Sequence, residues 1–121
     1  MTIGAWEVSV ERCEDAELVN LRGAVDASNI NQVKDRLETL CTRNKPRVLI
    51  DCSMVNYLNS TAFGLLYHCH QLCVSNHGRL VLFGVPQKIA DIMKILGLDS
   101  ILTICRGKAD ALKKVHAADD V

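Results

Sequence analysis

The sequence predicts an α/β domain: a mixed, mostly parallel sheet of four to five strands, with an antiparallel hairpin at one edge and about four helices packed on it. Short apolar runs without polar alternation are typical of strands that helices cover on both faces. Amphipathic helical segments separate these runs, and a helix between two strands makes them parallel. The predicted order is β-β-α-β-α-β-α-β-α, and 121 residues fit a single domain with its core at about 6–116 and a frayed tail at 117–121.

The first third of the chain predicts an edge hairpin followed by a helix. Residues 6–10 alternate apolar and polar side chains, and after a polar turn the apolar residues resume at 18–21, as in two antiparallel strands. Gly23 interrupts the second strand, and the segment 26–29 offers side chains that cap helices. A first amphipathic helix follows, with these apolar residues at helical spacing: Ile30, Val33, Leu37, Leu40 and Cys41.

The middle of the chain predicts a buried strand and the second helix. The apolar run 48–50 leads into Asp51 and Ser53, and we expect a loop over 54–58 before a helix over about 60–76. One face of this helix should meet the sheet, through Phe63, Leu66, Tyr67, His70, Cys73 and Val74. A second apolar strip lies beside it, which either a neighbouring helix or a partner protein covers: Leu65, Cys69 and Leu72.

The last third predicts two more strand and helix pairs. Residues 80–83 form a buried strand, and a third helix starts at Pro86 and ends before Gly97, a favourable residue after a helix. A short strand at 101–104 and a final helix at 107–116 complete the order. The third helix should turn four apolar residues inward: Ile89, Ile92, Met93 and Leu96.

Composition argues against nucleic-acid and membrane functions. Fourteen basic and fourteen acidic side chains cancel, and aromatic residues make up only 4% of the chain. No apolar run approaches the roughly 20 residues of a membrane span, and the first residues lack the pattern of a signal peptide, so we expect a cytoplasmic protein. In that setting we expect free thiols at all six cysteines: 13, 41, 52, 69, 73 and 105.

Metal binding and catalysis find little support in the residues. The segment 68–70 with Cys73 resembles a metal cluster, but on a helix the two histidines point about 160° apart, so the four side chains do not converge. Asp26 and Asp51 are candidate catalytic acids, although acids at strand ends and before helices more often order loops. No nucleophile–base pair or glycine-rich phosphate loop is visible. We therefore expect no enzyme, no metal and no cofactor.

Ser60 is the residue with the clearest functional position. It begins the expected second helix at the carboxyl end of the buried strand, where unpaired N–H groups favour negative charge, so a phosphate on Ser60 would be locally stabilised. Serine is also common at helix starts for purely structural reasons, and from the residues alone that role is the more frequent one.

Three motifs resemble those of STAS domains, specifically the bacterial anti-sigma factor antagonists. Residues 51–53 and 59–64 are similar to the signature D-x-S … D-S-[ST]-G-x-G, with Asn59 in place of the acid and Ala62 in place of the first glycine. Residues 21–26 resemble L-x-G-x-[LV]-D, and 93–99 resemble the family's third-helix ending. The similarity spans roughly residues 6–115.

The resemblance implies a partner switch. In the family, the unphosphorylated antagonist binds an anti-sigma factor that is also a serine kinase of the histidine-kinase-like ATPase fold; phosphorylation blocks that complex and a phosphatase restores it. The implied phosphoacceptor is Ser60, with Thr61 a weaker candidate, and the Ser60 hydroxyl should be partly exposed beside Asp51 and near the loop 25–29. The implied site-supporting residues are Asp26, Asp51, Ser53 and Asn59, and the implied partner contacts are Asn59, Ser60, Thr61, Phe63, Gly64 and Pro86.

Two other functions stay open at this point. A STAS domain can be a subunit that regulates a transporter ATPase, as in lipid-trafficking ABC systems, or a sensor of a small ligand or nucleotide. The serine and second hydroxyl at 60–61 favour the antagonist. The gene neighbourhood would separate the first two, and the sequence leaves the sigma factor, the stimulus and the oligomeric state open.

Overall fold

A computed structural model describes residues 5–117, which form a five-stranded sheet in the order β1-β2-β3-β4-β5. β1 is antiparallel to β2 and the remaining pairs are parallel, so the predicted fold class is confirmed. None of the described helices is long and apolar enough to cross a membrane. The expected frayed tail lies almost entirely outside the described residues. The strands are β1 (Glu7–Cys13), β2 (Ala16–Val25), β3 (Arg47–Leu58), β4 (Arg79–Phe83) and β5 (Thr103–Cys105), and the helices are α1 (Ile30–Cys41), α2 (Ser60–Ser75), α3 (Gln87–Ile95), the 3-10 turn η1 (Leu98–Ser100) and α4 (Lys108–Ala117).

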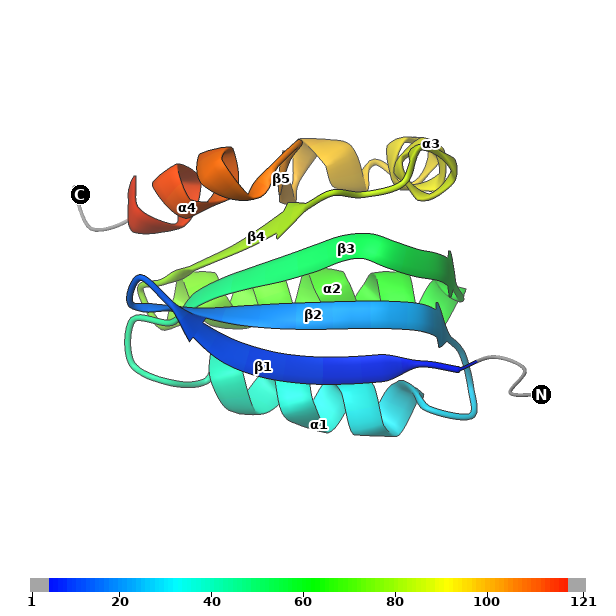
Figure 1. The fold of residues 1–121 in the computed structure, drawn as a ribbon, viewed down its shortest axis with the longest axis horizontal. Helices are drawn as coiled ribbons and strands as arrows, with labels where there is room; N and C mark the ends of the chain where they lie inside the picture. The colour runs from blue at the N-terminus through cyan, green and yellow to red at the C-terminus, as the bar shows by residue number, and fades with distance from the viewer. Residues whose placement is uncertain (1–4, 118–121) are drawn as a thin grey trace.

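Helices cover the two faces of the sheet unequally. α1 and α2 lie side by side behind the sheet, and α3 and α4 lie along its β4–β5 side (Figure 1). The larger hydrophobic core fills the space under α1, α2 and α3 and includes Val48, Ile50 and Leu82. A smaller core on the opposite face joins α4 to the sheet through Leu49, Val81, Phe83, Ala111 and Val115. That face is therefore covered only in part.

β3 is the central strand, and it is longer than predicted. The expected loop over 54–58 is wrong, because β3 continues beside β2 to Leu58. Its inward side chains there are Cys52, Val55 and Leu58, three residues apart instead of two. Two register shifts against β2, where β3 contributes an extra residue each time, keep these side chains on the buried face. The bulges thus removed the period of two that marks a strand.

The buried face of α2 differs from the predicted one. Tyr67 and Val74 are 38% and 53% exposed, whereas Leu65 and Cys69 are buried in the larger core. α1 lies alongside α2 (Figure 1) and covers this second strip, so the strip is not a surface left free for a partner. Two neighbours, the sheet and α1, explain why α2 is apolar over so wide an arc.

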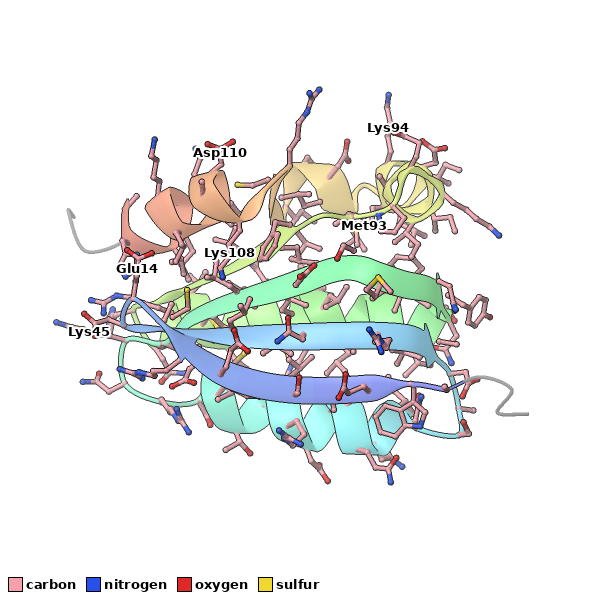
Figure 2. The ribbon with its side chains drawn as sticks, viewed as in Figure 1. Glu14, Lys45, Met93, Lys94, Lys108 and Asp110 are labelled. Atoms are coloured by element: carbon pink, nitrogen blue, oxygen red, sulfur yellow. The ribbon has the colours of Figure 1, made fainter. Side chains whose placement is uncertain are left out.

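α3 buries fewer residues than predicted. Ile89 and Met93 are buried, but Ile92 and Leu96 are exposed, because α3 packs at the margin of the sheet through a narrow stripe. Figure 2 shows Met93 on the side facing the sheet and Lys94 pointing away from it. Gly97 ends this segment with a φ of +76°, as the sequence predicted.

Gly23 fixes the path of the chain at the end of β2. Its φ is +84°, and a Cβ atom added there would lie 2.1 Å from the carbonyl oxygen of Ala5. Only glycine allows this close approach of the N-terminal segment. Because β2 then continues to Val25 beside Leu58 of β3, the two strands end next to each other.

Candidate functional site

Ser60 lies where the carboxyl ends of β2 and β3 meet. Val25 pairs with Leu58, and the N–H of Asn59 donates to the carbonyl oxygen of Val25 at 3.1 Å. Ser60 is the first residue of α2, and both Ser60 and Thr61 are exposed. Ser60 is thus an exposed residue, as predicted, and it follows directly on the residue that is bonded to Val25.

Asn59 is the N-cap of α2. Its backbone is extended (φ −82°, ψ 174°), and its Oδ1 accepts the N–H of Ala62 at 2.8 Å. The carbonyl oxygen of Asn59 also accepts the N–H of Phe63, the first bond of the helix. The side chain thus satisfies one of the donors that every helix leaves free at its start. No acidic residue lies in the first turn, so the positive end of the helix dipole is uncompensated next to Ser60.

The loop after β2 is held by its own side chains. The carboxylate of Asp26 accepts both the N–H of Ser28, at 2.9 Å, and the Ser28 hydroxyl. These two bonds lower the pKa of Asp26 below its usual value. Asn29 is buried, accepts the N–H of Asp26 at 2.9 Å and donates to the carbonyl oxygen of Ala24 at 2.8 Å, so it ties the loop to β2 instead of capping α1. The result is a fixed loop beside the start of α2.

Asp51 and Ser53 do not reach Ser60. Asp51 pairs with Asn20 and Phe83 in the body of the sheet, and β3 continues from it to Leu58 over roughly 20 Å of strand. The expectation that Asp51 lies beside Ser60 is wrong. Its Oδ1 accepts the N–H of Ser53 at 2.9 Å, which orders the first bulge of β3 on the open face of the sheet.

The implied partner contacts fall into two groups. Asn59, Ser60 and Thr61 share the start of α2, and Gly64 is exposed one turn further along. Phe63 is only 4% exposed and belongs to the core, so its expected place in a contact surface is wrong. Pro86 forms the second group, because it lies between β4 and α3. β4 ends opposite Asp51, whereas β3 continues to Leu58, next to the start of α2.

The structure has a hollow between α1 and α2 that the sequence did not predict, here called the α1–α2 hollow. It has a volume of about 450 Å³ and is lined by Ile30, Lys34, Thr61, Gly64, Leu65 and His68. His68 Nε2 lies 2.8 Å from Glu38 Oε2 of α1. The helical spacing of Thr61, Leu65 and His68 was visible in the sequence, but their apposition to α1 was not.

The histidine and cysteine segment of α2 does not converge. His68 reaches α1, whereas Nδ1 of His70 is buried without a hydrogen-bond partner within the described part of the chain. Burial, and the charge of Arg79, lower the pKa of His70. Among residues 5–117 no group of three or more His, Cys, Asp or Glu side chains is placed to hold a metal ion. The six cysteines are free thiols.

Comparison with known proteins identifies the family of this chain. A family model described as "Mlab, STAS domain" matches residues 8–103. The anti-sigma-B factor antagonist of Listeria monocytogenes is 29% identical over 94 residues, which cover 78% of this chain and 82% of that protein.

Solved structures agree with the family model. An anti-sigma factor antagonist from Mycobacterium paratuberculosis superimposes with a TM-score of 0.84 at 17% identity, covering 95% of this chain and 97% of that one. The phosphorylated form of the Bacillus cell fate determinant SpoIIAA gives a TM-score of 0.68 at 14% identity, covering 92% and 99%. At these identities the structures establish the fold, and together with the family match over most of the chain they show that this protein belongs to the STAS domain family.

Proposed function

We propose that this STAS domain is an anti-sigma factor antagonist that phosphorylation of Ser60 switches off. The observation that carries the proposal is the exposed Ser60 hydroxyl on the first turn of α2, held in place by the Asn59 cap and by the bond from Asn59 to Val25. The Listeria relative is named as an antagonist of an anti-sigma factor, and a structural neighbour is named as a phosphorylated form. Both names support the proposal.

In this function the unphosphorylated surface binds an anti-sigma factor that is itself a serine kinase of the histidine-kinase-like ATPase fold. Transfer of a phosphoryl group to Ser60 adds about −1.5 to −2 charges and three acceptor oxygens. The start of α2 accommodates this charge, because the free N–H groups and the dipole favour an anion there. A phosphatase that removes the group restores the binding surface.

The partner surface does not accommodate the charge. An unpaired charge buried under a partner costs several kcal/mol, on the order of 3 to 5. Because about 1.4 kcal/mol corresponds to tenfold in affinity, this cost dissolves a micromolar complex. The switch therefore acts on affinity and leaves the fold of the antagonist unchanged.

The test uses the purified histidine-kinase-like ATPases of the source genome, each incubated with this protein and ATP. Intact mass and peptide mapping should find one added phosphate on Ser60, and Ser60→Ala should abolish it. Ser60→Asp should keep the melting temperature nearly unchanged and weaken kinase binding at least tenfold. Ser75→Asp is the matched control, because Ser75 is exposed at the opposite end of the same helix. It should leave binding intact and lower the melting temperature slightly, since its charge meets the negative end of the dipole.

Phosphate on Thr61 alone would show that Ser60 is not the switch residue. Kinase binding by Ser60→Asp as tight as that of the wild type would remove the proposed charge mechanism. Both outcomes are read from the same protein preparations as the positive result.

A second candidate is a STAS subunit that regulates a transporter ATPase without being phosphorylated. Asn59 favours it, because an amide cannot accept the proton of the Ser60 hydroxyl as the acid of the family signature can. This candidate predicts a stable complex with an ABC-type ATPase and no phosphate on Ser60 after incubation with the kinases.

A further inference from the structure

β1 is an open edge of the sheet. The strand order ends with β1, so β1 has a neighbouring strand on one side only, and Figure 1 shows it at the margin of the sheet. It is seven residues long, contains no proline and pairs with β2 without a register shift. Natural proteins often shorten, bend or interrupt such an edge, because its unpaired N–H and C=O groups accept further strands. The opposite edge, β5, is only three residues long, so β1 is the edge that can take another strand.

The hairpin turn determines which backbone groups of β1 face outward. Glu14 and Asp15, with φ angles of +49° and +67°, form a two-residue turn, which makes Cys13 and Ala16 a hydrogen-bonded pair. Bonded and non-bonded pairs then alternate along the antiparallel ladder. The residues of β1 whose N–H and C=O groups point away from β2 are therefore Val8, Val10 and Arg12. These donors and acceptors recur at the spacing that an added strand requires.

A hollow beside this edge leaves room for the side chains of an added strand. It lies between β1 and α1 and has a volume of about 510 Å³. Its wall on β1 is apolar and consists of the half-buried Trp6 and Val8. Its wall on α1 is polar and consists of Gln32, Asp35 and Arg36. Every second side chain of an added strand would point towards this hollow, where an apolar group would cover Trp6 and Val8.

The other face of β1 is acidic. Glu7 and Glu11 are exposed, and the alternation of the strand places them on the face away from the larger core. Neither forms an ion pair or hydrogen bond among the described residues, although Arg22 lies opposite Glu7 in the register. Arg12 is already bonded to Glu17 at 2.7 Å. The unpaired charges along this edge are thus two carboxylates, which match lysine or arginine at alternate positions of an added strand.

The same two glutamates disfavour a second copy of this chain. In an antiparallel pair of β1 with its own copy, Glu7 or Glu11 lies directly opposite or diagonal to a glutamate of the copy in every register that overlaps the strands well. Like charges at such positions are destabilising. The edge therefore selects a different chain with basic side chains.

We propose that the outer edge of β1 binds an extended segment of a partner protein in which apolar residues alternate with lysine or arginine. The segment adds a strand to the sheet, and its backbone bonds to the outward groups of Val8 and Val10. Its apolar side chains enter the hollow beside α1, and its basic side chains pair with Glu7 and Glu11. The start of α2 takes no part in this surface, so the proposal is independent of the proposed function.

Calorimetry with a synthetic peptide tests the proposal. The probe is a capped peptide of alternating lysine and valine, matched in length to β1. We expect it to bind in a one-to-one ratio. A peptide with the same lysines and valines in two blocks, and an alternating peptide of glutamate and valine, should bind at least tenfold more weakly. In amide exchange followed by NMR, bound peptide should newly protect the N–H of Val10, whereas the N–H of Ser9 is already bonded to β2.

Two variants of β1 separate backbone pairing from charge. Val10→Pro removes an outward N–H and keeps the ladder with β2, so it should weaken binding at least tenfold. Val10→Ala is the matched control, since it shortens the same side chain, keeps the N–H and should retain binding. Glu7→Lys combined with Glu11→Lys should reverse the preference, so that the glutamate peptide binds better than the lysine peptide. Asp110→Lys, on α4 at the far side of the sheet in Figure 2, should change neither affinity.

Three outcomes would overturn the proposal. The first is no binding of the lysine peptide to the wild-type protein at up to about 1 mM, a concentration that detects even weak complexes. The second is a loss of binding on charge reversal without any loss in Val10→Pro, which would show charge attraction without strand addition. The third is a wild-type dimer in sedimentation velocity that Val10→Pro dissociates, which would make a second copy the occupant. Phosphorylation of Ser60 is measured separately, so the proposed function stands or falls on its own experiment.

Discussion

Substitution of Asn59 tests the local structure that presents Ser60. Asn59→Ala removes the acceptor of the 2.8 Å bond from Ala62 N–H, and the loss of such a cap costs about 1 kcal/mol of stability. Asn59→Asp keeps the acceptor and adds a negative charge to a first turn that has none, which contributes roughly 0.3–1 kcal/mol in the stabilising direction. For a domain of this size, about 1 kcal/mol corresponds to roughly 4 °C in melting temperature.

The expected order of stability is therefore Asn59→Asp above wild type above Asn59→Ala. Urea unfolding and thermal melts followed by circular dichroism measure it at pH 7, and the gain of the acid should shrink as salt is added. Equal loss in the two variants would show that Asn59 is not acting as a cap and would refute the reasoning. With the kinase, Asn59→Asp should also speed phosphorylation of Ser60, because one carboxylate oxygen stays free to accept a proton.

Three further predictions follow from the structure. The pKa of Asp26 is lowered in the folded state, so its contribution to stability is present above the unfolded pKa of about 3.9 and is lost as the pH falls through the lower folded value. Asp26→Asn should therefore lower the free energy of unfolding at pH 7. In urea titrations the variant should also lose less stability than the wild type as the pH falls below 4. Iodoacetamide should label Cys13 and Cys105 first in the native protein and label Cys52 only in denaturant, because burial raises the pKa of Cys52 to about 12. An intact-mass time course measures the labelling, and a disulfide in the native protein would contradict the prediction. Phe63→Ala should cost about 3–5 kcal/mol in urea unfolding as a core residue, whereas a cost under 1 kcal/mol would place Phe63 on the surface.

The sequence predicted the strand and helix order because most elements carried a local pattern of their own. The continuous apolar runs of β3 and β4, and the helical spacing in α1, were local signals of burial. The loop expected at 54–58 shows the limit of this reading. The bulges in β3 depend on its pairing with β2, and they make every third residue point inward instead of every second one. The local sequence pattern does not reveal this spacing as that of a strand.

The site was predictable at Ser60 and Asn59 and not at Asp51. Asn59 and Ser60 are the N-cap and the first residue of α2, so their sequence order fixes their closeness in space. The distance from Asp51 to Ser60 depended on whether the intervening segment was a compact loop or an extended strand, and the extended strand moved them apart. The sequence also could not predict that Lys34 and Leu65 line the same hollow, because the α1–α2 hollow is formed by two helices that are distant in sequence.

The division of the hydrophobic residues into two cores of unequal size has a consequence for how the protein opens. α4 is fastened to the sheet mainly by the smaller core, through Ala111 and Val115, and by the bond from Arg79 to the carbonyl oxygen of Lys114. Fewer buried contacts mean a lower free energy of local opening, so the backbone amides of α4 should exchange with solvent sooner than those of α1, α2 and β3. We therefore expect α4 to detach from the sheet while the start of α2 keeps its shape, because α2 packs on the larger core.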